Sequence, residues 1–312
     1  MGRKEIIFIH GMARSGTSAL TKVLALCGGA LPGSLKEANE ANPKGFWEPL
    51  EAAKLNDEFL SRHDSTFSDP TLRLQGEWTF APAETERFVE HIRTFLRRCP
   101  QGGAPLLIKD ARIIALFDFW LPATLAEDYR VKMIVPVRHP MEVAASLATR
   151  AQERAQIPAS LELRQALWLK YNLLAELQSR QFPRVFIEYS SLLEDWRREV
   201  ARVSRALDLD LAPDAAAVDE FLTPDLHRQR YSGSIPDVFG QPWVSDTYEL
   251  LSEAARDRSL DGARLDGILR TYRLCERAFR TSLDDWRRRL PPRPSAESAT
   301  TPADTLAIAA RG

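Results

Sequence analysis

The 312-residue sequence predicts an α/β fold in which a central, mostly parallel sheet lies between helices on both faces, in three layers. Short apolar runs rich in β-branched residues are the first observation behind this prediction. Each run is too short for a helix and lacks the alternation of a half-exposed strand, as is typical of strands buried on both faces. The second observation is that helical patterns separate the runs, and strands that alternate with helices form parallel sheets. The expected strands are residues 5–9, 105–108, 131–137 and 184–187.

Helices are expected between these strands and after the last of them. Two glycines end the first helix, and the second carries acidic residues early and arginines late, as the helix dipole favours. In the last helix, Tyr272, Phe279 and Trp286 recur every seven residues, and we expect this stripe to pack in the core. The expected helices are residues 18–27, 83–98, 141–152, 160–181, 191–207, 246–258 and 262–289, with a helical insert at 50–64.

The sequence predicts one domain over residues 1–290, followed by a disordered tail over 291–312. The tail is rich in Pro, Ser, Thr and Ala and has few large apolar residues with which to build a core. Two irregular segments, 28–50 and 223–244, each contain several Pro, Gly and aromatic residues. Loops of this length in a compact domain are more often functional than accidental, which makes both segments candidates for the border of a site.

The composition argues against several function classes. A net charge of −1 gives no case for nucleic-acid binding, which usually shows as a strongly basic domain. The three cysteines, Cys27, Cys99 and Cys275, lie far apart and form no metal-binding pattern, so we expect no metal site and a reducing compartment. No run approaches the roughly 18 apolar residues of a membrane span. We therefore expect a cytoplasmic protein without an integral membrane segment, and the sequence is silent on its oligomeric state.

The most specific signal is the segment at 11–18, which reads Gly-Met-Ala-Arg-Ser-Gly-Thr-Ser directly after the first apolar run. A buried strand, a glycine-bounded turn and a helix form the frame of a phosphate-binding P-loop, so the fold is expected to be of the P-loop type. Unpaired amides and the dipole at the start of the helix attract an anion, and Gly16 lets it approach the backbone. Arg14 adds a fixed positive charge, and hydroxyl donors come from Ser15, Thr17 and Ser18.

This loop differs from the version that binds nucleoside triphosphates. That version ends in Gly-Lys-Ser/Thr, and its Lys reaches the terminal phosphates while the hydroxyl holds magnesium. Here Thr17 occupies the Lys position, and the cation comes earlier, at Arg14. The loop therefore lacks the group that handles a γ-phosphoryl group, and a 5′-phosphosulfate fits it better.

A second anion site is expected where the third strand ends. Arg138, followed by His139-Pro140, lies at the carboxyl end of that strand, where ligands of open α/β sheets bind. Ser146 lies about two turns along the next helix and faces the same side as its start. An arginine and a hydroxyl in this arrangement suit a second phosphate at some distance from the first.

Together these segments resemble the sulfotransferases that use 3′-phosphoadenosine 5′-phosphosulfate (PAPS). The loop at 13–18 resembles their 5′-phosphosulfate loop, in the form with Arg that carbohydrate and tyrosylprotein members often have. Arg138 with Ser146 is similar to their 3′-phosphate site at the same spacing. The segment 187–192 resembles their Tyr-Glu-Asp-Leu segment, although only Tyr189 and Leu192 match, and the family's Tyr lies near the adenine. The resemblance covers roughly residues 5–210, with its parts in the family's order.

The resemblance implies PAPS as co-substrate, adenosine 3′,5′-bisphosphate as product, and transfer of the sulfuryl group to a hydroxyl without a metal. In-line transfer needs positive groups at the leaving bridging oxygen, and Arg14 is one of them. Lys109 is the second, because it resembles the Lys that opens the family's Lys-x-His segment. The chain continues as Asp110-Ala111-Arg112, so the His that serves as base in small-molecule sulfotransferases is absent.

The general base is therefore expected elsewhere. Other branches of the family use a Glu after the first helix, where this chain has Gly-Phe-Trp-Glu-Pro with Glu48. Aromatic shielding is expected to raise the pKa of this carboxyl toward a useful range, which makes Glu48 the first choice. Asp110, Asp57 and His63 remain alternatives.

The acceptor cannot be identified from the sequence. Departures from the phenol-type enzymes favour a small-molecule, carbohydrate or lipid hydroxyl by analogy. The segments 28–50 and 223–244 and the insert at 50–64 are expected to line its pocket, while Arg228 and Arg230 are expected to reach the 3′-phosphate. Two rival functions stay open: a P-loop kinase or nucleotidase, and a nucleotide-binding interaction protein that has lost catalysis.

Overall fold

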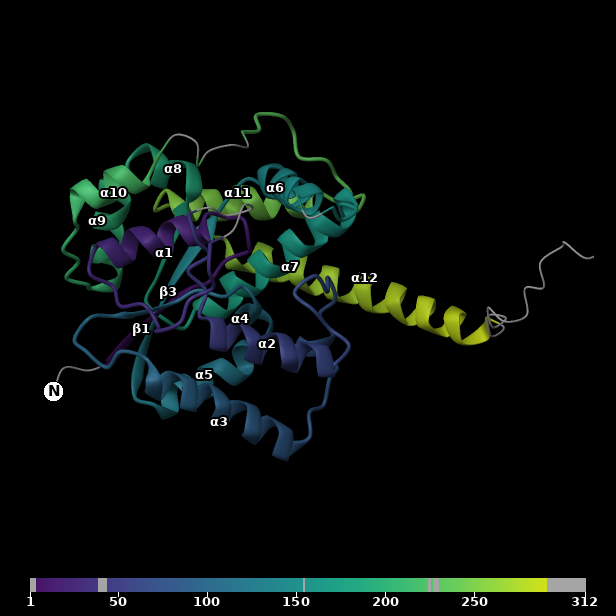
Figure 1. The fold of residues 1–312 in the computed structure, drawn as a ribbon. Coiled ribbons are helices and arrows are strands. Elements are labelled where there is room, and N and C mark those ends of the chain that lie inside the picture. Colours follow the sequence, from purple (N-terminus) through teal and green to yellow (C-terminus); the bar gives the residue numbers. More distant parts are fainter. Residues whose placement is uncertain (1–3, 39–43, 154, 224–225, 227–229, 291–312) are drawn as a thin grey trace, which may run out of the picture.

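The computed structural model describes residues 4–38, 44–153, 155–223, 226 and 230–290 (Figure 1). In this part of the chain, a parallel sheet has the strand order β2-β1-β3-β4. Its register places Ile7 between Leu107 on one side and Lys132 on the other. All of the expected strands are confirmed, and they are β1 (Lys4–Ile9), β2 (Leu106–Ile108), β3 (Tyr129–Val137) and β4 (Arg184–Glu188).

Helices cover both faces of the sheet (Figure 1). Successive residues of a strand point to opposite faces, so β1 divides its side chains between two cores. Ile7 and Ile9 pack with α1 (Thr17–Leu26) and α9 (Trp196–Leu207), whereas Ile6 and Phe8 pack with residues of α3 (Pro82–Arg98) and α5 (Phe117–Ala126). The remaining helices are α2 (Leu50–Arg62), α4 (Arg112–Ala115), α6 (Pro140–Glu153), α7 (Leu161–Ser179), α8 (Tyr189–Glu194), α10 (Ala215–Phe221), α11 (Trp243–Ala255) and α12 (Gly262–Arg289), with a 3₁₀ turn, η1 (Arg73–Gln75).

The helices differ from the expected ones at three places, and one of them is α10, which was not expected. The helix expected at 191–207 is divided into α8 and α9 at Asp195, whose carboxylate caps α9 by accepting from the Arg198 amide. The helices α4 and α5 were not expected, because nearly every residue from Ile113 to Trp120 is buried and the segment has no amphipathic period.

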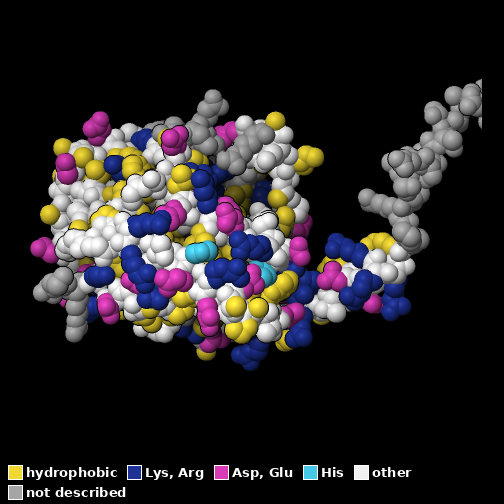
Figure 2. Space-filling model, turned by 60° about the horizontal axis from the view of Figure 1, so that its bottom comes forward, with side chains coloured by type: hydrophobic (Ala, Val, Ile, Leu, Met, Phe, Trp, Pro, Cys, Tyr) yellow, Lys and Arg dark blue, Asp and Glu magenta, His cyan; other side chains and the backbone are white. Residues whose placement is uncertain are grey.

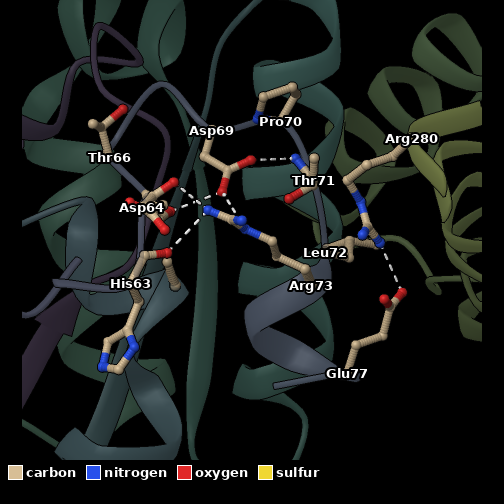
Figure 3. A network of polar contacts seen from close by, with 12 residues as sticks. His63, Asp64, Thr66, Asp69, Pro70, Thr71, Leu72, Arg73, Glu77 and Arg280 are labelled. Carbon is tan, nitrogen blue, oxygen red and sulfur yellow. Dashed lines mark hydrogen bonds and ion pairs between the residues drawn. The ribbon is translucent and has the colours of Figure 1, made fainter. Parts of the chain in front are cut away.

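The expectation that the whole aromatic stripe of α12 packs in the core is wrong. Tyr272 is buried and its hydroxyl donates to the Pro70 carbonyl, but Phe279 is 69% exposed and Trp286 is 56% exposed. The body contacts the helix up to Arg280, which pairs with Glu77 at 2.8 Å (Figure 3). Beyond that residue α12 stands clear of the body (Figures 1 and 2).

None of the helices in the described residues combines the length and the apolar character that a membrane span requires. The tail expected at 291–312 lies outside the described residues. A single domain over residues 1–290 stays a prediction.

Candidate active site

The carboxyl edge of the sheet brings together one expected site residue from each strand end. Arg14 follows β1, Lys109 follows β2, Arg138 follows β3 and Tyr189 follows β4, and all of them line one pocket. This is the edge where open parallel sheets bind ligands. The pocket is also lined by Gly16, Thr17, Ser18, Glu48 and Ser146 of the expected set.

The loop after β1 has the conformation that an anion site requires. Gly16 has φ of +82°, and a Cβ there would lie 2.1 Å from Cδ2 of the Tyr189 ring, so no larger residue fits. Arg14 also lies in the left-handed region, at φ of +71°. No side chain caps the N-terminus of α1, whose first residues line the pocket. The first-turn N–H groups are therefore available to a ligand.

Arg14 connects this loop to the residues expected at the second anion site. Its Nε donates to Ser146 Oγ at 2.9 Å, and its carbonyl accepts from Arg138 Nη1 at 2.9 Å. The Arg138 guanidinium lies 4.7 Å from the centroid of the Tyr189 ring and pairs with Glu142 at 2.9 Å. The loop and the second group therefore form one continuous surface.

Positive charge is concentrated on this surface. Burial lowers the pKa of Arg14 to about 10, and repulsion by Arg150 and Arg138 acts in the same direction, while Glu153 opposes it. Arg150 was missed by the sequence reasoning, although it follows Ser146 by four residues and so shares its helix face. Because burial and the neighbouring cations both disfavour the charged form of Arg14, a bound anion would stabilise that form.

Lys109 and Glu48 form a buried ion pair beside the start of α1. Lys109 Nζ lies 2.7 Å from Glu48 Oε1 and also donates to the Phe46 carbonyl at 3.2 Å and to Ser18 Oγ at 3.3 Å. Lys109 is 4% exposed and Glu48 is 9% exposed.

The expected rise in the pKa of Glu48 is wrong. Burial alone would raise it, but Lys109, Arg112 at 3.8 Å and Lys36 at 3.9 Å together hold the pKa of this carboxyl below its ordinary value. Burial does exclude water from Glu48, yet the surrounding cations outweigh that effect. Glu48 is a paired carboxylate in this structure.

The alternative bases lie apart from this pocket. Asp110 pairs with Arg112 at 2.6 Å and accepts from Asn56 Nδ2 at 2.9 Å, and it lines the neighbouring pocket instead. Asp57 pairs with Arg112 from an exposed position. His63 packs among aromatic rings and lies 3.2 Å from Glu84. Of these candidates, Glu48 is the one that shares the pocket with the loop.

Several other expected residues do not reach the pocket. Ser15 is fully buried, and its hydroxyl has no hydrogen-bond partner among the described residues. Arg230 lines a separate hollow with Glu142 and Tyr231. Arg228 lies outside the described residues. In the described part of the chain, no three His, Cys, Asp or Glu side chains gather in a way that could hold a metal ion.

No family model matches the sequence, and no curated protein matches it. Solved structures do match the fold. The sulfotransferase domain of the Synechococcus PCC 7002 olefin synthase aligns with a TM-score of 0.50 at 16% identity, over 80% of this chain and 95% of that one. A sulfotransferase from Alicyclobacillus acidocaldarius aligns with a TM-score of 0.41 at 14% identity, over 84% of this chain and 99% of that one. The sulfotransferase STF1 from Mycobacterium tuberculosis H37Rv aligns with a TM-score of 0.39 at 14% identity, over 79% of this chain and 77% of that one. The similarity to the Synechococcus domain shows that this chain has a sulfotransferase fold.

The Glu48–Lys109 pair predicts a pH-dependent contribution to stability. Because the pKa of Glu48 is lowered on folding, the pair stabilises the protein above the ordinary carboxyl value of 4.5, and this contribution is lost as pH falls through the lowered value. Glu48→Gln leaves Lys109 buried without its counter-charge, so we expect a loss of about 2–4 kcal/mol in the free energy of unfolding at pH 7.

Urea denaturation of wild type and Glu48→Gln at several pH values measures this loss. The difference should narrow as the pH falls below about 4. The control Glu51→Gln, at an exposed position of α2, should change stability by less than about 0.5 kcal/mol. A Glu48→Gln difference that is the same at pH 3 as at pH 7 would contradict the pairing.

Proposed function

We propose that this chain is a PAPS-dependent sulfotransferase that transfers a sulfuryl group to an acceptor hydroxyl. The observation that carries the proposal is that one pocket contains two cationic groups. The start of α1 and Lys109 form one group, and Arg14, Arg138 and Ser146 form the other. PAPS has two anionic ends, a 5′-phosphosulfate and a 3′-phosphate, and so needs two such groups. The sulfotransferase fold supports the same proposal.

The two ends of the donor are assigned by the chemistry of each group. The 5′-phosphosulfate is assigned to the first-turn amides of α1, the hydroxyls of Thr17 and Ser18, and Lys109. The 3′-phosphate is assigned to the Arg138 guanidinium, Ser146 and the Arg14 guanidinium, whose Nε donates to Ser146 Oγ. This differs from the expectation that Arg14 acts on the leaving oxygen, a role that falls to Lys109 in this assignment.

The transfer itself breaks one bond and forms another. The acceptor oxygen attacks sulfur in line, and the bond from sulfur to the bridging oxygen breaks with its electron pair going to adenosine 3′,5′-bisphosphate. Lys109 stabilises the charge that develops on that oxygen. The hydroxyl proton passes to the Glu48 carboxylate. When Lys109 turns toward the donor, Glu48 loses its nearest cation, and its pKa rises toward the range that a base needs.

The rival functions lack comparable support. A kinase or nucleotidase needs a Lys in the loop, and Thr17 stands in that position. A nucleotide-binding protein without catalysis would keep the cationic groups and the Glu48–Lys109 pair, but it would release no adenosine 3′,5′-bisphosphate from PAPS. Each rival predicts a result that differs from that of a sulfotransferase in the measurements below.

Arg14→Ala should weaken binding of adenosine 3′,5′-bisphosphate about 10- to 100-fold, because it removes a charged donor from the 3′-phosphate group. Calorimetric titration measures this loss, with Arg62→Ala on the exposed end of α2 as the control. Wild-type affinity in Arg14→Ala would contradict the assignment of Arg14 to the 3′-phosphate. Thermal stabilisation of wild type by magnesium-ATP that exceeds stabilisation by adenosine 3′,5′-bisphosphate would favour the kinase.

Glu48→Gln should retain donor binding and lose transfer by about 10²- to 10⁴-fold, because the amide cannot accept the hydroxyl proton. Release of adenosine 3′,5′-bisphosphate from PAPS, with a panel of hydroxyl acceptors, measures transfer. If the variant runs at the wild-type rate, the base lies elsewhere, and Asp110 is the next candidate. Binding of PAPS by wild type without release across the panel would favour the inactive binding protein.

A further inference from the structure

A second pocket adjoins the first at Glu48. The two share Ala13, Arg14, Phe46, Glu48 and Arg150 in their walls. Most of the second pocket comes from α6, α7, the segment after α2 and the residues after β2. Among the described residues, the loop at 28–50 contributes Lys36, Phe46 and Glu48, whereas 50–64 and 223–244 contribute nothing.

One wall of this second pocket is apolar and held rigidly. Phe67 stacks on Tyr171 with ring centroids 5.0 Å apart, and the Tyr171 hydroxyl donates to the Phe67 carbonyl at 2.9 Å. The segment that follows is fixed by Asp69, which accepts from the Thr71 amide and pairs with Arg73 (Figure 3). Leu147, Leu167, Ala111 and Ile157 complete the apolar part.

Cationic side chains exceed carboxylates in the rest of the wall. Among the described residues, five Lys and Arg side chains line it against two acids, Glu48 and Asp110. Both acids are already engaged, Glu48 with Lys109 and Asp110 with Arg112. On the face seen in Figure 2, Lys and Arg side chains lie among Asp and Glu side chains.

Arg164 is the cation best placed to bind an anion that is not the donor. Arg14 and Arg150 also line the first pocket, Lys36 lies 3.9 Å from Glu48, and Arg112 pairs with Asp57 and Asp110. Arg164 is half-buried at the first turn of α7, and it lines the second pocket without lining the first.

Two backbone carbonyls hold the Arg164 guanidinium in place. Its Nη1 donates to the Ala144 carbonyl at 2.5 Å, and its Nε donates to the Ser160 carbonyl at 3.2 Å. These carbonyls orient the group but do not neutralise it, and no carboxylate of the described residues lies within 4 Å of it. A fixed guanidinium with an uncompensated charge is suited to a planar or tetrahedral oxyanion.

We propose that the acceptor is a hydroxyl compound with an apolar body and an anionic group, a carboxylate or a phosphate, which Arg164 binds. This inference rests on the proposed function, since it assigns the second pocket to the acceptor of the same transfer. The apolar body lies along Phe67, Leu147 and Leu167, and the hydroxyl faces Glu48. Neutral sugars and cationic acceptors are poor substrates in this assignment.

Binding of compounds that cannot be sulfated tests the anion site separately from catalysis. Decanoate and decyl phosphate carry the anion without a free alcohol, and decanamide is the neutral control. At least one anion should bind wild type about 10-fold or more tighter than decanamide, and Arg164→Gln should remove that advantage. Arg164→Lys should restore part of it, and Arg62→Gln should leave it unchanged. Whichever anion binds identifies the head group. Equal binding of the anions and decanamide, or an advantage that survives in Arg164→Gln, overturns the inference.

Transfer assays then connect this anion site to the reaction. The 10-hydroxy derivative of the preferred anion should be sulfated with a KM at least about 10-fold below that of 10-hydroxydecanamide. In Arg164→Gln this KM should rise to the value of the amide, while kcat and the affinity for adenosine 3′,5′-bisphosphate stay unchanged. An equal loss on both acceptors overturns the inference, as does transfer to the amide alone. If decanoate or decyl phosphate binds through Arg164 but adenosine 3′,5′-bisphosphate does not bind, the proposed function fails and the anion site stands.

Discussion

The partial burial of Arg14 beside the like charges of Arg150 and Arg138 is the constraint on which the site depends. These guanidinium groups meet because β1, β3 and α6 converge at the carboxyl edge of the sheet. Glu142 and Glu153 offset part of their charge, yet burial, together with repulsion by Arg150 and Arg138, keeps the pKa of Arg14 lowered. A fold that holds such a cluster at a partly buried position gives up stability that an anionic ligand restores. The hydrogen bonds from Arg14 to Ser146 and from Arg138 to the Arg14 carbonyl keep the cluster ordered despite the repulsion.

The Glu48–Lys109 pair lies where the two pockets adjoin. Lys109 faces the start of α1, and Glu48 lies in the wall that both pockets share. One ion pair therefore links the proposed donor side to the proposed acceptor side. While Lys109 remains paired with Glu48, it keeps the carboxylate a weak base. In the proposed function, donor binding draws Lys109 away, so one lysine couples donor binding to activation of the acceptor.

Much of the fold could be predicted from the sequence because its strands are buried on both faces. A short apolar run bounded by turns has few other interpretations, and each strand of the sheet appears at the expected place. The loop after β1 was readable for a similar reason, since its glycines and hydroxyls are contiguous in the chain. The segment forming α4 and α5 was not readable, because residues buried all round show no period.

The electrostatics of the site could not be predicted in the same way. The pairing of Glu48 with Lys109 joins residues 61 positions apart, and a sequence shows the aromatic neighbours of Glu48 but not the cations that fold against it. Phe279 and Trp286 are exposed because the rest of the domain does not extend along this part of α12, and the local sequence pattern carries no information about that. Arg150 is different, because its spacing from Ser146 was visible and the helix period would have placed both residues on one face.

A crystal structure of the chain with adenosine 3′,5′-bisphosphate is the most direct test of the central claim. The account predicts that the 5′-phosphate lies on the first-turn amides of α1 within reach of Lys109, and that the 3′-phosphate contacts Arg138, Ser146 and Arg14. It also predicts that Lys109 has moved from Glu48 toward the 5′-phosphate. A nucleotide bound outside this pocket, or one whose 3′-phosphate lies at α1, would contradict the account.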